Sequence, residues 1–135
     1  MSEQLIELER RVLEKLLAGD HPVIRNLRTQ LSEIKVVKRD FTGSGFITSF
    51  RIDSFFIAPS LQGKDFKFGD VVADIENLEH GAGFVLYVAN GAIDALEGYS
   101  FEEKWPERIS QFKLSYVKGD TRDFARIDEP SKGKE

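Results

Sequence analysis

The sequence predicts an α+β domain in which two N-terminal helices pack on a mostly antiparallel sheet of five or six strands. Apolar residues recur at helical spacing up to about residue 34, whereas the later segments alternate with a period of two. Helices and strands that are segregated along the chain are typical of an antiparallel sheet with helices on one face. The dipeptide Asn90-Gly91 joins two apolar runs, which is the strongest short signal for a β-hairpin. At 135 residues and 41% hydrophobic, the chain can form one domain with a real core.

The first predicted helix covers residues 3–18, with Ser2 as its expected N-cap and Gly19 at its C-terminal stop. The apolar side of this helix is formed by Leu5, Leu8, Val12 and Leu16. A second helix of about three turns restarts at Asp20-His21-Pro22, where Asp or His caps the helix and Pro occupies its first turn. We expect this helical pair to cover one face of the sheet.

The strands begin where the period changes, and the first hairpin joins residues 34–41 to residues 46–52. A loop around Pro59 and Gly63 leads to a strand at 71–78, then to the central hairpin around Asn90-Gly91, and finally to a strand at 112–117. We predict one domain over residues 1–127. The tail at 128–135 offers nothing to bury, so we expect it to be disordered.

The central hairpin fixes a register when residues are counted outward from Asn90-Gly91. In this register Phe84 faces Glu97, which places Glu97 on the same face as Phe84 and Leu86. Both faces of the hairpin are mostly apolar, so we expect both to be covered. A carboxyl group buried on such a face would have a raised pKa, and Glu97 is therefore a candidate general acid or base. An acid at the rim of the sheet is the plainer interpretation.

His80 lies in a turn beside the central hairpin and is the second candidate for catalysis, because histidine changes charge near neutral pH. A histidine that only hydrogen-bonds to the loop backbone is the plainer interpretation. The single other histidine is His21, so no zinc-binding spacing exists, and we predict no metal and no cofactor. The absence of cysteine excludes disulfides, thiolate metal sites and a cysteine nucleophile.

Three aromatic residues lie within seven positions and are interleaved with charged residues, a composition typical of recognition surfaces. Between residues 70 and 107 the chain has nine acidic residues and one basic residue. This charge argues against nucleic acid as a partner, because phosphate binding needs a basic surface, and it would suit a cationic partner surface or a hard divalent ion. Solvated carboxylates and a lid over the core are the plainer interpretations. The predicted binding residues are Glu79, His80, Glu97, Tyr99, Phe101 and Trp105.

Two hypotheses of function follow from these residues. The preferred one is a non-enzymatic protein-interaction module that uses the acidic, aromatic surface of residues 79–105. The alternative is a small enzyme or ligand-binding domain with a pocket at the end of the central hairpin, in which His80 and Glu97 transfer protons and Tyr99 or Trp105 forms a wall. No apolar run approaches the ~20 residues of a membrane span, and no basic leader begins the chain, so we expect a cytoplasmic protein that does not bind membranes. The sequence does not set the oligomeric state.

Several stretches of the chain together resemble a family of small, single-domain bacterial proteins of unassigned function. They are Gly45-Phe46, residues 79–84 (EHGAGF), residues 94–99 (DALEGY) and Trp105-Pro106. The resemblance spans about residues 3 to 120 and implies a bacterial, cytoplasmic protein. It implies no reaction and no catalytic residue.

Overall fold

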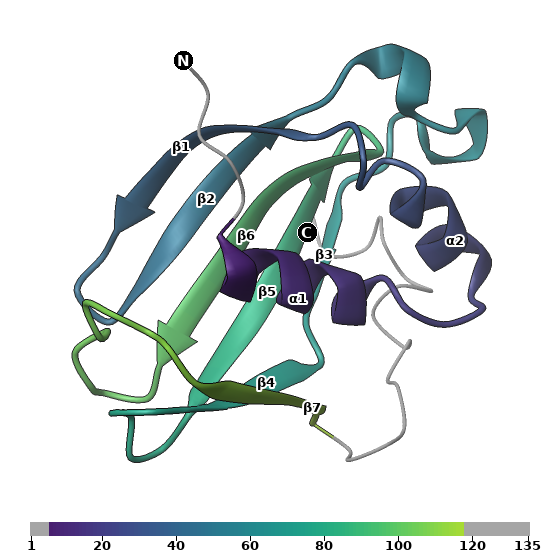
Figure 1. The fold of residues 1–135 in the computed structure, drawn as a ribbon. Coiled ribbons are helices and arrows are strands. Elements are labelled where there is room, and N and C mark those ends of the chain that lie inside the picture. The colour runs from purple at the N-terminus through teal and green to yellow at the C-terminus, as the bar shows by residue number, and fades with distance from the viewer. Residues whose placement is uncertain (1–5, 118–135) are drawn as a thin grey trace.

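In the computed structural model, which describes residues 6–117, one antiparallel sheet of seven strands is combined with two α-helices (Figure 1). The predicted α+β class with an antiparallel sheet is confirmed, but the sheet has seven strands and not five or six. The elements are α1 (Glu7–Leu16), α2 (Pro22–Arg28), β1 (Lys35–Phe41), β2 (Gly45–Arg51), β3 (Phe66–Phe68), β4 (Val71–Ile75), β5 (Ala82–Ala89), β6 (Ala92–Ser100) and β7 (Phe112–Tyr116), with short 3₁₀ helices η1 (Ser54–Phe56) and η2 (Pro59–Leu61) between β2 and β3.

Both helices are shorter than predicted. The expected cap Ser2 lies outside the described residues, and the backbone N–H of Ile6 donates to the Glu9 carboxylate at 3.1 Å as α1 begins. The predicted start of α2 is confirmed, because Nδ1 of His21 accepts from the N–H of Val23 and Pro22 follows the cap. The predicted length of three turns is wrong, since α2 has seven residues. No helix in residues 6–117 is long and apolar enough to cross a membrane.

The strand order is β1-β2-β6-β5-β4-β7, and β3 pairs with β5 beyond the end of β4. The unpredicted strand is β3, whose three residues are too few to show an alternating pattern. β3 and β4 share one edge of β5 and are separated by Gly69 and Asp70. A Cβ atom at Gly69 would lie 2.0 Å from the backbone oxygen of Phe84, so the chain passes too close to β5 there for any larger residue.

The sheet curls around α1, which lies across its concave face (Figure 1). The apolar side of α1 is buried against β4 and β5, as its helical spacing predicts. The core cluster contains Leu8, Val12, Leu13 and Leu16 of α1 together with Phe84, Leu86 and Leu96 of the hairpin. Burying each of these side chains contributes about 1.5–3 kcal/mol to stability, so this layer is a large part of the core.

The tip of the central hairpin is tied to distant parts of the chain. Asn90 and Gly91 have φ angles of 52° and 78°, and a type I′ turn needs positive φ at both central positions. The fully buried side chain of Gln30 donates to the carbonyl of Gly91 at 2.8 Å and accepts from the N–H of Ile93 at 2.9 Å. The segment after α2 therefore holds the tip of the hairpin through both groups of one buried amide.

A β-bulge lies in β6 between Ile93 and Ala95. Val88 pairs with Ile93 as predicted, but Tyr87 pairs with Ala95. Asp94 is thus an extra residue with no partner on β5. The predicted register is correct at the tip and wrong beyond Asp94.

The bulge reverses the predicted orientation of Glu97. Val85, and not Phe84, lies opposite Glu97. Since side chains alternate between the two faces of a strand, this shift of one residue moves Glu97 from the core face to the outer face. Val85, Tyr87 and Glu97 are all only partly buried there, so the expectation that both faces of the hairpin are covered is wrong for the residues described.

Candidate functional site

The outer face of the central hairpin carries a row of functional side chains, Tyr87, Glu97, Tyr99 and Phe101, which we call the outer strip. The hydroxyl of Tyr87 donates to Oε1 of Glu97 at 2.7 Å. The bulge makes this contact, because it pairs Tyr87 with Ala95 and so leaves Glu97 as its diagonal neighbour across the two strands. One acid and one phenol are therefore held together on the solvent side of the sheet.

The environment of Tyr87 keeps its hydroxyl protonated. Partial burial, followed by the hydrogen bond to Glu97 and the charge of that carboxylate, raises the pKa of Tyr87 to about 12. Nζ of Lys67 on β3 lies 5.7 Å from the centre of the Tyr87 ring, within the range of a cation–π contact. Tyr87 thus acts as a fixed hydrogen-bond donor to Glu97 at any physiological pH and leaves the second carboxylate oxygen for another donor.

The other end of the outer strip is aromatic. The rings of Tyr99 and Phe101 have their centres 5.6 Å apart in a tilted arrangement. The Tyr99 ring lies over Gly83 on β5, where a Cβ atom would be 2.6 Å from the Tyr99 hydroxyl. Glycine at this position lets the ring lie flat against the sheet, and Phe101, which is 46% exposed, packs on that fixed ring.

A second contact holds the turn at residues 79–81 against the loop that follows β6. The Glu103 carboxylate accepts from the backbone N–H groups of Glu79 at 2.9 Å and His80 at 2.8 Å. These two backbone hydrogen bonds, with that from Glu79 the larger effect, lower the pKa of Glu103. Glu79 and Glu102 are exposed on the two connected segments.

Trp105, a predicted binding residue, lies in the core. Its side chain is 7% exposed and contacts the Phe46 ring edge-on at 5.4 Å between centres. The interpretation of this tryptophan as a lid over the core agrees with its position, and it is too buried to form part of a surface.

The structure does not bring His80 and Glu97 together. Glu97 faces Val85, three residues inside the end of β5 at Ala82, which corresponds to about 10 Å along the strand. His80 lies two residues beyond that end and is exposed, and its backbone is held by Glu103. In the described part of the chain, Glu97 is bonded to Tyr87 and no contact joins it to His80.

Sequence analysis missed the most buried ionisable group in residues 6–117, Glu9 on α1. Nε and Nη2 of Arg39 on β1 both donate to this carboxylate at 2.7 Å, and the Thr48 hydroxyl and the Ile6 N–H also donate to it. The signal was present, because Glu9 follows Leu8 on the apolar side of the predicted helix. Each of the two carboxylate oxygens of Glu9 accepts two hydrogen bonds, so we interpret this cluster as structural.

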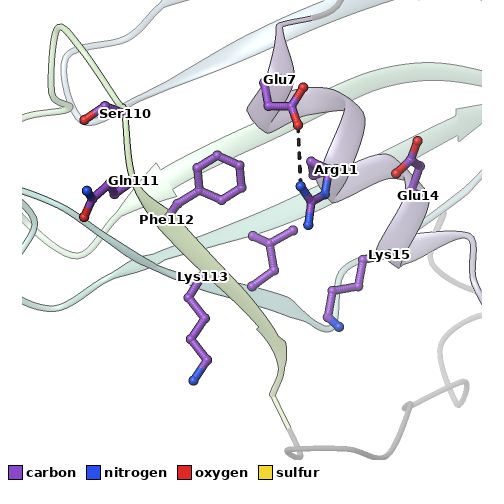
Figure 2. A pocket seen from close by; sticks show the side chains of 9 residues that line it. Glu7, Arg11, Glu14, Lys15, Ser110, Gln111, Phe112 and Lys113 are labelled. Carbon is purple, nitrogen blue, oxygen red and sulfur yellow. Dashed lines mark hydrogen bonds and ion pairs between the residues drawn. The ribbon is translucent and has the colours of Figure 1, made fainter.

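Two grooves lie beside β7. The larger one, of about 770 Å³, runs between α1 and β7 (Figure 2), and the smaller one, of about 430 Å³, is shared by β4 and β7. Neither is lined by His80 or Glu97. No group of three or more His, Asp and Glu side chains in residues 6–117 is placed to hold a metal ion.

Comparisons of the chain with protein families, with curated proteins and with solved structures found no match. The resemblance to small bacterial proteins therefore stays a prediction.

Proposed function

We propose that this protein is a non-enzymatic interaction module whose outer strip binds a basic surface of a partner protein. The observation that carries the proposal is the aromatic end of the strip, where Phe101 is 46% exposed and packs on a Tyr99 ring seated over glycine. An exposed ring that is already ordered loses little entropy on binding, which is how aromatic residues come to dominate interface energetics.

Arginine is the side chain that fits this surface best. A guanidinium group can stack on the face of an aromatic ring and also donate two parallel hydrogen bonds to a carboxylate. Glu97, which has one carboxylate oxygen bonded to Tyr87, lies two residues before Tyr99 on the same strand, and Glu102 directly follows Phe101 with an exposed side chain. The nine acidic residues between positions 70 and 107, against one basic residue, would attract such a partner and repel nucleic acid.

An enzyme that uses His80 and Glu97 as a proton-transfer pair is the weaker proposal, because the two residues lie on different segments without a shared contact. In keeping with the sequence resemblance, we place the binding activity in the bacterial cytoplasm. Fractionation of cells that produce the tagged protein would test this location, and recovery of the tagged protein in the membrane or exported fraction would refute it.

A peptide titration followed by NMR tests the binding proposal. The probes are three peptides of about twelve residues with one pattern of leucine and glycine, in which the charged positions are all Arg, all Lys or all Glu. We expect the Arg peptide to bind most tightly and to shift the resonances of Tyr99 and Phe101, the Lys peptide to bind more weakly, and the Glu peptide not to bind.

Matched variants make the outcome specific to the outer strip. Phe101→Ala should weaken binding of the Arg peptide by about tenfold, the effect of a typical interface hot spot. Phe55→Ala is the control, because Phe55 is 84% exposed and lies on η1, outside the strip. Equal losses in the two variants, or equally tight binding of the Glu peptide, would refute the proposal.

A further inference from the structure

The last described strand, β7, forms one edge of the sheet and pairs only with β4 in residues 6–117. At its two ends, the carbonyl of Gln111 accepts from the N–H of Glu76 at 3.2 Å, and the N–H of Val117 donates to the carbonyl of Asp70 at 2.8 Å. Backbone groups of successive residues in an antiparallel strand point to alternate sides. The odd-numbered residues of this segment therefore face β4, and the even-numbered residues face away from it.

The outward groups of β7 include the N–H and C=O of Phe112 and of Leu114. Within the described range, none of these four groups forms a hydrogen bond. Unlike the opposite edge strand β1, β7 has no irregularity that would discourage pairing with a further strand. β1 carries a bulge between Val36 and Lys38, a device that discourages pairing with further strands, whereas β7 continues for five regular pairs without irregularity.

A groove lies along this open edge. It has a volume of about 770 Å³ and separates β7 from the exposed side of α1 (Figure 2). The half-buried side chain of Phe112 points into the groove towards Arg11 of α1, while Lys113 points away from the helix (Figure 2). Near the C-terminal end of β7, the Tyr116 hydroxyl donates to the carbonyl of Lys15 at 2.8 Å, which fixes the helix against the strand.

We propose that an extended segment of a partner protein, with alternating apolar and acidic residues, adds to β7 as a further strand of the sheet. An extended backbone is the ligand that satisfies a row of outward N–H and C=O groups. This site lies at the edge of the sheet and not on the outer strip, so it goes beyond the function proposed above.

The side chains on each face of β7 determine the composition of the added strand. On the side of the groove, the partly buried Phe112 and Leu114 would contact its apolar residues. On the other face, Lys113 is exposed and forms no ion pair within residues 6–117, so an acidic residue opposite it on the added strand would form a favourable charge pair. The α1 side of the groove is lined by Glu7 and Glu14 as well as by Arg11 and Lys15, so its charges balance and the preference for an acidic residue depends on Lys113.

Amide hydrogen exchange of the full chain tests the proposal. The probe is a peptide of about seven residues that alternates valine and glutamate, and a second peptide has the same side chains but N-methyl groups on alternate backbone nitrogens. We expect the first peptide to slow exchange at the Phe112 and Leu114 amides by at least about tenfold and to leave the amides of β1 unchanged. The N-methylated peptide should bind at least about tenfold more weakly, because it keeps the side chains and loses the backbone donors.

Charge reversal provides an independent test. Lys113→Glu should weaken binding of the valine–glutamate peptide severalfold and strengthen binding of the corresponding valine–lysine peptide. Lys38→Glu is the matched control, because Lys38 is an exposed lysine on the opposite edge strand, and it should change neither affinity.

Three results would overturn the proposal. They are equal binding of the N-methylated peptide, equal effects of Lys113→Glu and Lys38→Glu, and protection of the Phe112 and Leu114 amides before any peptide is added. Protection that increases with protein concentration would assign the edge to a second copy of the chain. Protection that is independent of concentration would assign it to the chain itself.

Discussion

Replacing Glu9 with alanine should destabilise the protein more than the loss of any exposed carboxylate. Glu9 is fully buried, and its partner Arg39 retains only 11% side-chain exposure. The alanine variant would leave the Arg39 guanidinium without its bidentate partner and would remove the acceptor of the Thr48 hydroxyl and the Ile6 N–H. The cluster joins α1 to β1 and β2, so its loss affects the contact between the helix and the sheet.

The loss of stability in Glu9→Ala depends on the Arg39 guanidinium, which stays largely buried after its partner is removed. Removing one partner of a buried ion pair typically costs about 3–5 kcal/mol, because the other charge is left uncompensated. The residual exposure of Arg39 allows water to reach one side of the guanidinium, so we expect the lower end, about 3 kcal/mol. For a chain of this size, that loss corresponds to a decrease in Tm of about 10 °C.

Urea denaturation followed by circular dichroism measures this difference. The control is Glu14→Ala, which removes a half-exposed carboxylate that pairs with Arg10 on the same helix and should cost at most about 0.5 kcal/mol. The double variant Glu9→Met with Arg39→Met leaves no buried charge and should recover most of the loss. The reasoning fails if Glu9→Ala and Glu14→Ala unfold at the same urea concentration, or if the double variant is less stable than the single one.

Three further predictions concern the hairpin tip, the outer strip and the loop contact. Gly91→Val should destabilise the fold by more than about 2 kcal/mol in urea denaturation, because its Cβ atom would lie 2.4 Å from a backbone oxygen. Gly63→Val is the control, because Gly63 has a similar φ of 80° but open space around it, and it should lose only about 1–2 kcal/mol; equal losses in the two variants would contradict the tight packing at the tip. Titration by absorbance at 295 nm should show that Tyr87 ionises with a pKa of about 12, and Glu97→Gln should lower that pKa towards 10. Since the pKa of Tyr87 is raised on folding, its contribution to stability is complete below pH 10 and is lost as the pH rises towards 12; an unchanged titration in the Glu97 variant would exclude the hydrogen bond. Since the pKa of Glu103 is lowered on folding, its contribution to stability is present above pH 4.5 and is lost as the pH falls through the lowered pKa. The amides of Glu79 and His80 should therefore lose protection, measured against their intrinsic exchange rates, in acid and in Glu103→Ala, and unaltered protection would refute the contact.

The architecture was predictable where the sequence carries a period or a turn signal. The amphipathic side of α1, the His21-Pro22 start of α2 and the turn at Asn90-Gly91 all depend on local backbone chemistry, and each lies where the sequence places it. The strand β3 was not predicted, because three residues cannot show an alternating pattern and because its pairing with β5 depends on the close approach of the chain to β5 at Gly69.

The candidate site was harder to predict, because one residue decides it. Asp94 is an unpaired residue in a strand whose sequence alternates equally well in either register, so nothing local distinguishes the bulged hairpin from the regular one. That single residue places Glu97 beside Tyr87 and not beside Phe84. The capping role of Glu103 and the core position of Trp105 arise from contacts between segments far apart in sequence, which patterns of residue type do not encode.

The order of the strands has a consequence for how the chain is made. β2 pairs with β6, and the segment from residue 52 to residue 91 must be synthesised before that pairing can form. Until β4 and β5 have left the ribosome, the apolar side of α1 lacks the strands that it packs on, since both follow α1 by more than fifty positions in the chain. At a translation rate of about 5–20 residues per second, the apolar side of the α1 segment therefore stays exposed for most of the synthesis of the chain. We expect α1 to be the first segment that a chaperone would bind.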